Sequence, residues 1–127
     1  MSETKFYRCE HCGNIVSMVY EGGGTLVCCG DPMTELKANT TDAATEKHVP
    51  VITVDGNKVT VKVGSTLHPM TEEHYIMWIY LETEKGGEMK HLTPKDEPIA
   101  TFALAEGDKP VAAFEYCNLH GLWKADC

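Results

Sequence analysis

The fold is decided by one stretch of strand-forming residues, which reads Val49-Pro50-Val51-Ile52-Thr53-Val54-Asp55-Gly56-Asn57-Lys58-Val59-Thr60-Val61-Lys62-Val63. The β-branched residues on both sides of an Asp-Gly turn predict a hairpin of two antiparallel strands. Further strands are predicted at similar spacing over residues 75–81, 89–92, 101–104 and 111–116. Since no segment has a convincing helical pattern, we expect an all-β chain whose main body is an antiparallel β-sandwich.

A different pattern precedes this hairpin. The chain carries Cys9-Glu10-His11-Cys12 near its start and the adjacent pair Cys28-Cys29 further on. Four thiolates at this spacing can surround one metal ion as a tetrahedron, and soft sulfur ligands select zinc or iron. The adjacent pair is unusual, because two neighbouring cysteines reach the same ion only if the backbone between them twists.

Disulfide bonds are the alternative, because the chain has six cysteines and small secreted proteins commonly pair theirs. A bridge between Cys28 and Cys29 would close a strained ring, since bridged Cα atoms prefer a wider separation. The chain begins without an apolar leader segment, and it has no apolar run long enough to span a bilayer. We therefore expect a reducing, cytoplasmic location, where such cysteines are typical of metal ligands.

The composition indicates a packed protein whose partners are not polyanions. Hydrophobic residues make up 43% of the chain, and 19 acidic against 11 basic residues give a net charge of −8. This charge argues against nucleic acids and anionic membranes as main partners. We expect a small Cys-rich domain over residues 1–36, a polar linker over 37–47 with one helical turn within residues 37–44, and a sandwich domain over 48–127. Because the small domain has few apolar residues, a metal ion would supply much of its stability.

A second group of candidate ligands lies near the ends of predicted strands. His48 stands two residues before Pro50, His68 precedes a proline, and His120 precedes a glycine. Cys117 and His120 also form a Cys-x-x-His turn, whose amides can hydrogen-bond a thiolate. Each observation alone is weak, because a histidine at a strand end is more often a hydrogen-bonded polar residue than a metal ligand. Spacing cannot assemble scattered ligands into one site, so both interpretations stay open at this point.

Longer motifs resemble a known family. In chain order they are Cys9-x-x-Cys12…Cys28-Cys29, Glu46-Lys47-His48-Val49-Pro50, His68-Pro69-Met70, His74-Tyr75 and Glu115-Tyr116-Cys117-Asn118-Leu119-His120-Gly121. In this order, and over essentially the whole chain, they are similar to the desulfoferrodoxins, the two-iron superoxide reductases. The one-iron relatives, the neelaredoxins, resemble only the C-terminal part.

The resemblance implies two iron centres. A rubredoxin- or desulforedoxin-like Fe(Cys)4 centre would be held in the N-terminal domain by Cys9, Cys12, Cys28 and Cys29. A second iron would lie in an immunoglobulin-like sandwich domain, with Cys117 as axial ligand and a square plane of His48, His68, His74 and His120. Three residues match no ligand position of the family. We expect His11 to be exposed, with tuning of the first centre through solvent or a hydrogen bond as the alternative, His91 to be a surface or strand residue, and Cys127 to be a free thiol.

The resemblance also implies an activity, which is the one-electron reduction of superoxide to hydrogen peroxide in oxygen detoxification. Four neutral imidazoles and a thiolate would leave ferrous iron with a vacant position opposite the sulfur, where the anion can bind. Lys47 would attract superoxide and position a water for proton delivery. Glu46 would take the vacant position once the iron is ferric. The electron would come from an external donor such as rubredoxin, and the family implies a homodimer.

Two other classes of function are compatible with parts of the pattern. A zinc-ribbon interaction module would explain the N-terminal cysteines, but it would leave the later histidines and Cys117 without a role. An iron electron-transfer protein without a substrate of its own would explain both centres, but it needs no open coordination position and no Lys47 beside it. Without the resemblance, Glu46 and Lys47 would be an exposed polar pair before a strand.

Overall fold

The computed structural model describes residues 4–127, which form two compact units. The described part of the smaller unit runs over residues 4–37, and the larger unit is Ala38–Cys127. Strands make up 46% of the structure and helix only 3%, which confirms the prediction of an all-β protein. Within the described residues, no helix is long and apolar enough to cross a membrane.

The smaller unit is built from two short antiparallel sheets. One sheet has the order β2-β1-β5, and the other pairs β3 with β4. The bounds are β1 Phe6–Arg8, β2 Ile15–Ser17, β3 Val27–Cys28, β4 Asp31–Pro32 and β5 Thr34–Glu35. Among the described residues of this unit, the buried apolar side chains are those of Phe6 and Cys9, whereas Val19 and Tyr20 are 96% and 84% exposed. So small a core does not hold a fold by itself, and bound metal is expected to stabilise this unit.

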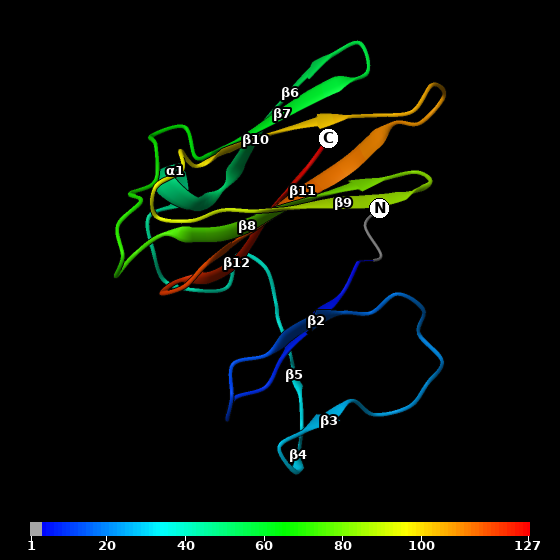
Figure 1. Cartoon of the computed structure of the whole chain (residues 1–127), viewed down its shortest axis with the longest axis vertical. Helices are drawn as coiled ribbons and strands as arrows, with labels where there is room; N and C mark the ends of the chain where they lie inside the picture. Colours follow the sequence, from blue (N-terminus) through cyan, green and yellow to red (C-terminus); the bar gives the residue numbers. More distant parts are fainter. Residues whose placement is uncertain (1–3) are drawn as a thin grey trace. The chain divides into compact units, whose positions relative to one another are not determined.

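The larger unit is a sandwich of two antiparallel sheets (Figure 1). The three-stranded sheet has the order β10-β7-β6, in which β6 is Pro50–Asp55, β7 is Lys58–Val63 and β10 is Ile99–Ala103. The four-stranded sheet has the order β12-β11-β8-β9, in which β8 is Ile76–Thr83, β9 is Gly86–His91, β11 is Pro110–Cys117 and β12 is Gly121–Asp126. A single helical turn, α1 (Thr45–His48), precedes β6. This arrangement confirms the predicted sandwich.

The core of the larger unit is formed by alternate residues of strands from both sheets. β7 contributes Val59 and Val61, and β8 contributes Ile79 and Leu81, all without exposed surface. Burying an aliphatic side chain of this size stabilises a fold by about 1.5–3 kcal/mol relative to leaving it exposed. Cys117 at the end of β11 belongs to the same cluster. The core therefore fixes the strand ends from which the second centre is built.

The predicted hairpin is confirmed together with its turn. β6 and β7 pair in a register that joins Pro50 to Val63 and Asp55 to Lys58. Gly56 in the turn has a φ of 62°, a left-handed conformation that glycine adopts without strain.

Two elements differ from the sequence-based prediction. Residues 121–126 form β12, which pairs along its length with β11 and buries Leu122 and Trp123. A strand this short after a turn has no clear alternation of its own and forms because the edge of β11 is available to it. The helical turn lies at Thr45–His48, later than the small polar residues of the predicted linker suggest, and four residues are too few to show a helical period.

The segment before α1 packs against β12. The backbone N–H of Asn39 donates to the carbonyl of Leu122 at 3.0 Å. The side chain of Asn39 accepts from the N–H of Lys124 at 2.8 Å and donates to its carbonyl at 3.1 Å. Part of the predicted linker is therefore hydrogen-bonded to the sandwich.

Candidate metal centres

The first centre lies where two loops of the smaller unit meet. Cys9 and Cys12 come from the loop after β1, whereas Cys28 ends β3 and Cys29 begins the turn to β4. The sulfur atoms of these residues all lie within 4.8 Å of one another. The Sγ of Cys28 is 3.7 Å from that of Cys12 and 4.0 Å from that of Cys29. All cysteines of the chain lie in the described part and are free thiols, so the arrangement is that of a metal site and not of disulfide bonds.

The backbone at the adjacent cysteines has the twist that the sequence analysis predicts. Cys29 has a φ of 52°, in the left-handed region that non-glycine residues rarely adopt. This conformation lets two consecutive sulfur atoms face one point. The first loop closes through a hydrogen bond of 2.9 Å from the N–H of Gly13 to the carbonyl of Cys9, and Gly13 is also left-handed, with a φ of 83°.

Hydrogen bonds within the cysteine group shift the pKa values of its thiols in opposite directions. The backbone N–H of Cys12, which lies 3.5 Å from the Cys9 sulfur, lowers the pKa of Cys9 to about 6. Hydrogen bonding with the thiol of Cys12 raises the pKa of Cys29 to about 12, and hydrogen bonding with Cys9 raises the pKa of Cys28. A thiophilic cation would deprotonate the remaining thiols, because it binds thiolates. The donor set therefore fits zinc or iron in tetrahedral coordination.

A hydrogen-bonded pair links the two cysteine loops. The Nε2 atom of His11 lies 2.5 Å from Oδ2 of Asp31, and the two side chains are 56% and 64% exposed. His11 belongs to the first loop, and Asp31 follows Cys29 by two residues. The surface position predicted for His11 is confirmed, whereas its partner on the opposite loop is not evident from sequence spacing.

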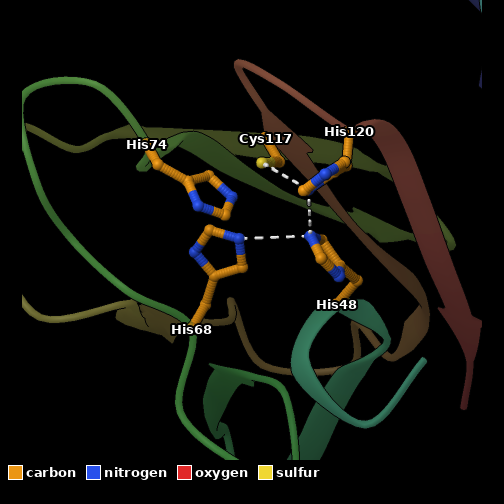
Figure 2. Close-up of side chains that lie close together, drawn as sticks. All are labelled: His48, His68, His74, Cys117 and His120. Carbon is orange, nitrogen blue, oxygen red and sulfur yellow. Dashed lines mark hydrogen bonds between the residues drawn. The ribbon is translucent and has the colours of Figure 1, made fainter. Parts of the chain in front are cut away.

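The second centre draws on separate segments of the larger unit, which converge in Figure 2. His48 ends α1, His68 and His74 lie in the loop between β7 and β8, Cys117 ends β11, and His120 lies in the turn to β12. One donor atom of each residue lies within 4.8 Å of those of the others. The structure thus brings together every residue that the resemblance implies for the second iron.

The imidazole rings stand at the corners of a near-square. Around this square the ring centroids are 4.7 Å apart for His48 and His68, 4.5 Å for His68 and His74, 5.0 Å for His74 and His120, and 4.9 Å for His120 and His48. Neighbouring rings are nearly perpendicular, with interplanar angles between 78° and 89°. The opposite pair, His48 and His74, is 6.4 Å apart. This pinwheel lets each ring direct a nitrogen atom at one central ion without a clash between rings.

Hydrogen bonds at the outer nitrogens show which atom of a ring faces the centre. The Nδ1 atom of His48 lies 2.8 Å from the carbonyl of Ala44, and that of His68 lies 2.7 Å from the carbonyl of Pro69. A carbonyl only accepts, so in a neutral ring Nδ1 carries the proton and Nε2 has the free lone pair. The Nε2 atoms of His48 and His68 nevertheless lie 3.2 Å apart. Two facing lone pairs repel unless a cation lies between them, so this arrangement fits a bound metal ion.

Burial keeps these histidines neutral and able to bind a cation. It lowers the pKa of His68 to about 4, and it also lowers the pKa of His48 and of His74. The Nε2 atom of His74 is buried without a hydrogen-bond partner in the described part of the chain. His120 faces inward with Nδ1, which lies 3.1 Å from Nε2 of His48. Neutral rings with inward lone pairs are the state that metal coordination requires.

Cys117 completes the set with a sulfur atom held in the core. Its side chain has no exposed surface, and Sγ lies 3.9 Å from Nδ1 of His120. Burial raises the pKa of this thiol, while hydrogen bonds from the backbone amides of Leu119 and His120 lower it. These amides confirm the prediction that the Cys-x-x-His turn hydrogen-bonds the sulfur. A mixed set of imidazoles and one thiolate suits iron.

Asn118 is a supporting residue to which the sequence analysis assigns no role. Its Oδ1 accepts a hydrogen bond of 2.9 Å from the N–H of Tyr75, and its Nδ2 donates one of 3.0 Å to the carbonyl of Glu73. These bonds clamp the residues on both sides of His74 to the turn that follows Cys117. The only sequence signal is the presence of an asparagine inside the Cys-x-x-His motif.

Trp123 and Glu115 are two further neighbours that sequence reasoning misses. The indole N–H of Trp123 donates to the carbonyl of His120 at 3.1 Å, and its ring stacks on that of His48 with centroids 4.9 Å apart. Glu115 is fully buried two residues before Cys117, and neither of its carboxyl oxygens has a hydrogen-bond partner among residues 4–127. Burial raises the pKa of Glu115 well above its usual range, because desolvation disfavours the charged carboxylate.

The remaining predicted residues lie beside the second centre or outside both centres. Glu46 and Lys47 are exposed residues of α1 that directly precede His48. After burial, which is the main cause, the nearby charge of Lys47 contributes to the lowered pKa of His48 and of His74. His91 and Cys127 belong to neither donor group. His91 is an exposed residue at the end of β9, and Cys127 is a free thiol, as predicted.

Comparison with known proteins agrees with this architecture. The family model described as "Desulfoferrodoxin, N-terminal domain" matches residues 2–36, and the one described as "Desulfoferrodoxin" matches residues 40–126. The chain belongs to the desulfoferrodoxin family. The desulfoferrodoxin of Syntrophotalea carbinolica is 52% identical to it over 120 residues, which cover 94% of either chain.

Solved structures of superoxide reductases have the same fold as this desulfoferrodoxin-family chain. That of Treponema pallidum matches with a TM-score of 0.83 at 41% identity, over 98% of this chain and 100% of that chain. The 1Fe superoxide reductase of Giardia intestinalis matches with a TM-score of 0.56 at 35% identity, over 65% of this chain and 97% of its own. The family has two iron sites, and the cysteine-only group and the histidine–cysteine group account for both.

Proposed function

We propose that this desulfoferrodoxin-family protein reduces superoxide to hydrogen peroxide. Each superoxide ion takes one electron from an external donor and two protons, and no oxygen is formed, so the reaction is a reduction and not a dismutation. The convergence of His48, His68, His74, His120 and Cys117 on one point carries the proposal. The solved structures with matching folds are named superoxide reductases, which supports it.

The residues of the second centre have separate tasks in this reaction. Iron held by the four histidines and Cys117 would supply a one-electron reductant and a position for an anion. The pinwheel of imidazoles holds four directions around the centre, and Cys117 adds an electron-rich sulfur from the core side. The amides of Leu119 and His120 stabilise the thiolate form of Cys117. The outer hydrogen bonds to Ala44 and Pro69 hold the rings of His48 and His68 in orientation.

Lys47 and Glu46 handle the substrate and the product. The chain carries a net charge of −8, so an anionic substrate needs a local positive charge. Lys47 supplies this charge beside His48 and positions a water molecule for proton delivery. Glu46, its neighbour in α1, would supply a carboxylate to the oxidised iron and would so help hydrogen peroxide to leave.

We assign the Fe(Cys)4 centre of Cys9, Cys12, Cys28 and Cys29 to a domain over residues 1–36, joined by the linker 37–47 to a reductase domain over 48–127. The electrons for the reaction come from an external donor such as rubredoxin. The protein acts as a homodimer in a reducing cytoplasm. Free thiols support the location, and the exposed Val19 and Tyr20 of a unit with little core support association.

Metal analysis with an optical spectrum, followed by reaction with superoxide, tests the function. We expect two irons per chain with separate absorption bands, because the thiolate-only and histidine–thiolate donor sets share no residue. Superoxide should oxidise the second centre and yield one hydrogen peroxide per superoxide without oxygen. Zinc in place of iron would indicate an interaction module. Iron that exchanges electrons with rubredoxin but does not react with superoxide would indicate an electron carrier.

A further inference from the structure

The turn that follows β7 holds the backbone of α1. The carbonyl oxygen of Glu46 accepts a hydrogen bond of 2.9 Å from the backbone N–H of Thr66 and another of 3.2 Å from the hydroxyl of Ser65. Residues 64–66, here called the 64–66 turn, therefore contact the helical turn that carries Lys47.

Gly64 brings the 64–66 turn close to α1. A Cβ atom at residue 64 would lie 2.7 Å from the carbonyl carbon of Lys47 and 2.9 Å from its Cα, and it would come nearer still to the carbonyl oxygen of Glu46. Real Cβ atoms essentially never show separations under 3.0 Å. The close approach of the two backbones therefore requires glycine at this position.

The 64–66 turn is also tied to the second centre. The backbone N–H of His68 donates to the carbonyl of Val63 at 3.0 Å, so the turn lies within a closed loop between the end of β7 and a histidine of the centre. One short segment thus supports His68 on one side and the residues before His48 on the other.

The helical turn α1 does not set its own orientation. It has four residues, and Ala44 provides no side-chain cap at its start. Two backbone bonds join it to its flanking residues, from the N–H of Lys47 to the carbonyl of Ala44 at 3.2 Å and from the N–H of Val49 to the carbonyl of Thr45 at 3.0 Å. A helix this short is not stable in isolation, so its orientation depends on tertiary contacts, which include those of Glu46 with the 64–66 turn.

We propose that Ser65 is a positioning residue for superoxide capture, because its hydroxyl anchors the α1 carbonyl that sets the direction of Lys47. The inference rests on the role proposed above for Lys47. Ser65 is exposed and is not a member of the donor group. Loss of its hydroxyl leaves the bond between His48 and the Ala44 carbonyl in place. The second centre therefore stays assembled while Lys47 samples more orientations.

Three variants of the iron-loaded protein test this inference. Ser65→Ala removes one of the two bonds to the Glu46 carbonyl, and Ser65→Thr keeps a hydroxyl at that position. Thr66→Ala is the matched control, because it removes a neighbouring exposed hydroxyl but keeps the backbone N–H that bonds Glu46. Hydrogen exchange of a peptide over residues 44–49, followed by mass spectrometry, reports the opening of α1 without reference to activity. Pulse radiolysis gives the bimolecular rate with superoxide and its dependence on salt.

In Ser65→Ala, the backbone amides of residues 44–49 should exchange hydrogen about fivefold faster than in the parent. Loss of one ordinary neutral hydrogen bond raises the population of the open form of α1 by about this factor. The rate of this variant with superoxide should fall by about two- to threefold, with a weaker dependence on salt, because the charge of Lys47 is spread over more positions. Ser65→Thr and Thr66→Ala should stay close to the parent in both measurements. The inference is overturned if Ser65→Ala exchanges like the parent or if Thr66→Ala changes as much.

Lys47→Ala separates this inference from the proposed function. If Lys47→Ala captures superoxide as fast as the parent, the role of Lys47 fails and the inferred task of Ser65 fails with it. If Lys47→Ala is slow but Ser65→Ala captures superoxide like the parent, the proposed function stands and the positioning role of Ser65 is rejected.

Discussion

At the scale of single residues, the proposed role of Lys47 is to supply a local positive charge on a chain whose net charge is −8. We expect Lys47→Ala to slow the bimolecular reaction with superoxide by about tenfold, through loss of local electrostatic attraction. Lys47→Arg should keep most of the rate, since it keeps the charge. Rising salt should slow the parent more than Lys47→Ala, because ions screen the attraction that the variant lacks. Pulse radiolysis at low and high salt measures both effects.

Lys58→Ala is the matched control for Lys47→Ala. It removes the same charge from an exposed lysine at the turn end of the β6–β7 hairpin, where residue 58 pairs with Asp55. This end is opposite to the one where Pro50 pairs with Val63, near α1. A general effect of net charge would slow both variants equally, and that result would contradict a local role of Lys47.

His11 and Asp31 give a second prediction for single residues, since their side chains join the two cysteine loops of the first centre. His11→Ala and Asp31→Ala should each speed the loss of iron to a chelator by about threefold. This factor corresponds to the small free energy that one exposed hydrogen-bonded pair contributes. The double variant should lose iron no faster than either single variant, because both remove the same contact. The rate of iron loss is measured from the decrease of the thiolate absorption band.

Lys5→Ala is the matched control for this pair. Lys5 forms an exposed ion pair with Glu21 at 2.8 Å in the same unit, and neither residue belongs to the cysteine loops. Lys5→Ala should leave the rate of iron loss unchanged. Additive effects of His11→Ala and Asp31→Ala would show that the two side chains act separately and would contradict the link.

At the scale of elements, the second centre depends on how the loop between β7 and β8 is held against the turn between β11 and β12. Asn118 makes this connection through Tyr75 and Glu73. Asn118→Ala should lower the free energy of unfolding by about 1–2 kcal/mol, because a backbone N–H loses its partner. It should also shift the absorption band of the histidine–thiolate iron, because His74 loses its orientation. Chemical denaturation and the optical spectrum measure the two effects.

Asn118→Asp and Asn57→Ala are the controls for this prediction. Asn118→Asp keeps an acceptor for the N–H of Tyr75 and loses the donor to Glu73, so its effects should be smaller. Asn57 lies in the turn of the β6–β7 hairpin, and its Nδ2 donates a hydrogen bond of 3.3 Å to the carbonyl of Leu104. Asn57→Ala should change stability without a shift of the iron band. An unshifted band in Asn118→Ala would limit Asn118 to general stability.

At the scale of the whole molecule, two donor groups that share no residue lie in two compact units. Cys12→Ser should remove the thiolate-only centre and destabilise the smaller unit, because metal binding is part of its folding free energy. Reduction of superoxide by the pre-reduced protein should survive. Cys117→Ser should abolish that reduction and leave the band of the first centre intact. Optical spectra and pulse radiolysis of both variants check the separation.

Cys127→Ser controls for the loss of a thiol, since Cys127 is free and outside both groups. It should resemble the parent in spectrum and in rate. An equal loss of superoxide reduction in the Cys12 and Cys117 variants would show that the two centres do not work separately.

Local sequence patterns predict those parts of the fold that form between residues close together in the chain. The β6–β7 hairpin is predictable because its strands alternate around an Asp-Gly turn, whose Gly56 is left-handed. The twist at Cys29 is predictable because adjacent cysteines cannot otherwise face one ion. β12 and α1 are poorly predictable, since each is short and depends on hydrogen bonds from distant segments, namely β11 and the 64–66 turn.

The sequence by itself determined the all-β class, the spacing of the first cysteine group and the identity of the candidate ligands, the latter through the order of the family motifs. These properties reside in local residue types and intervals. Only the tertiary structure decided that His48 and His120, 72 positions apart, face each other at 3.1 Å. It also decided that Asn118 and Ser65 support loops carrying other residues of the centre. Such contacts depend on which strand ends the packed core brings together. The spacing of residues along the chain does not by itself predict which strand ends these are.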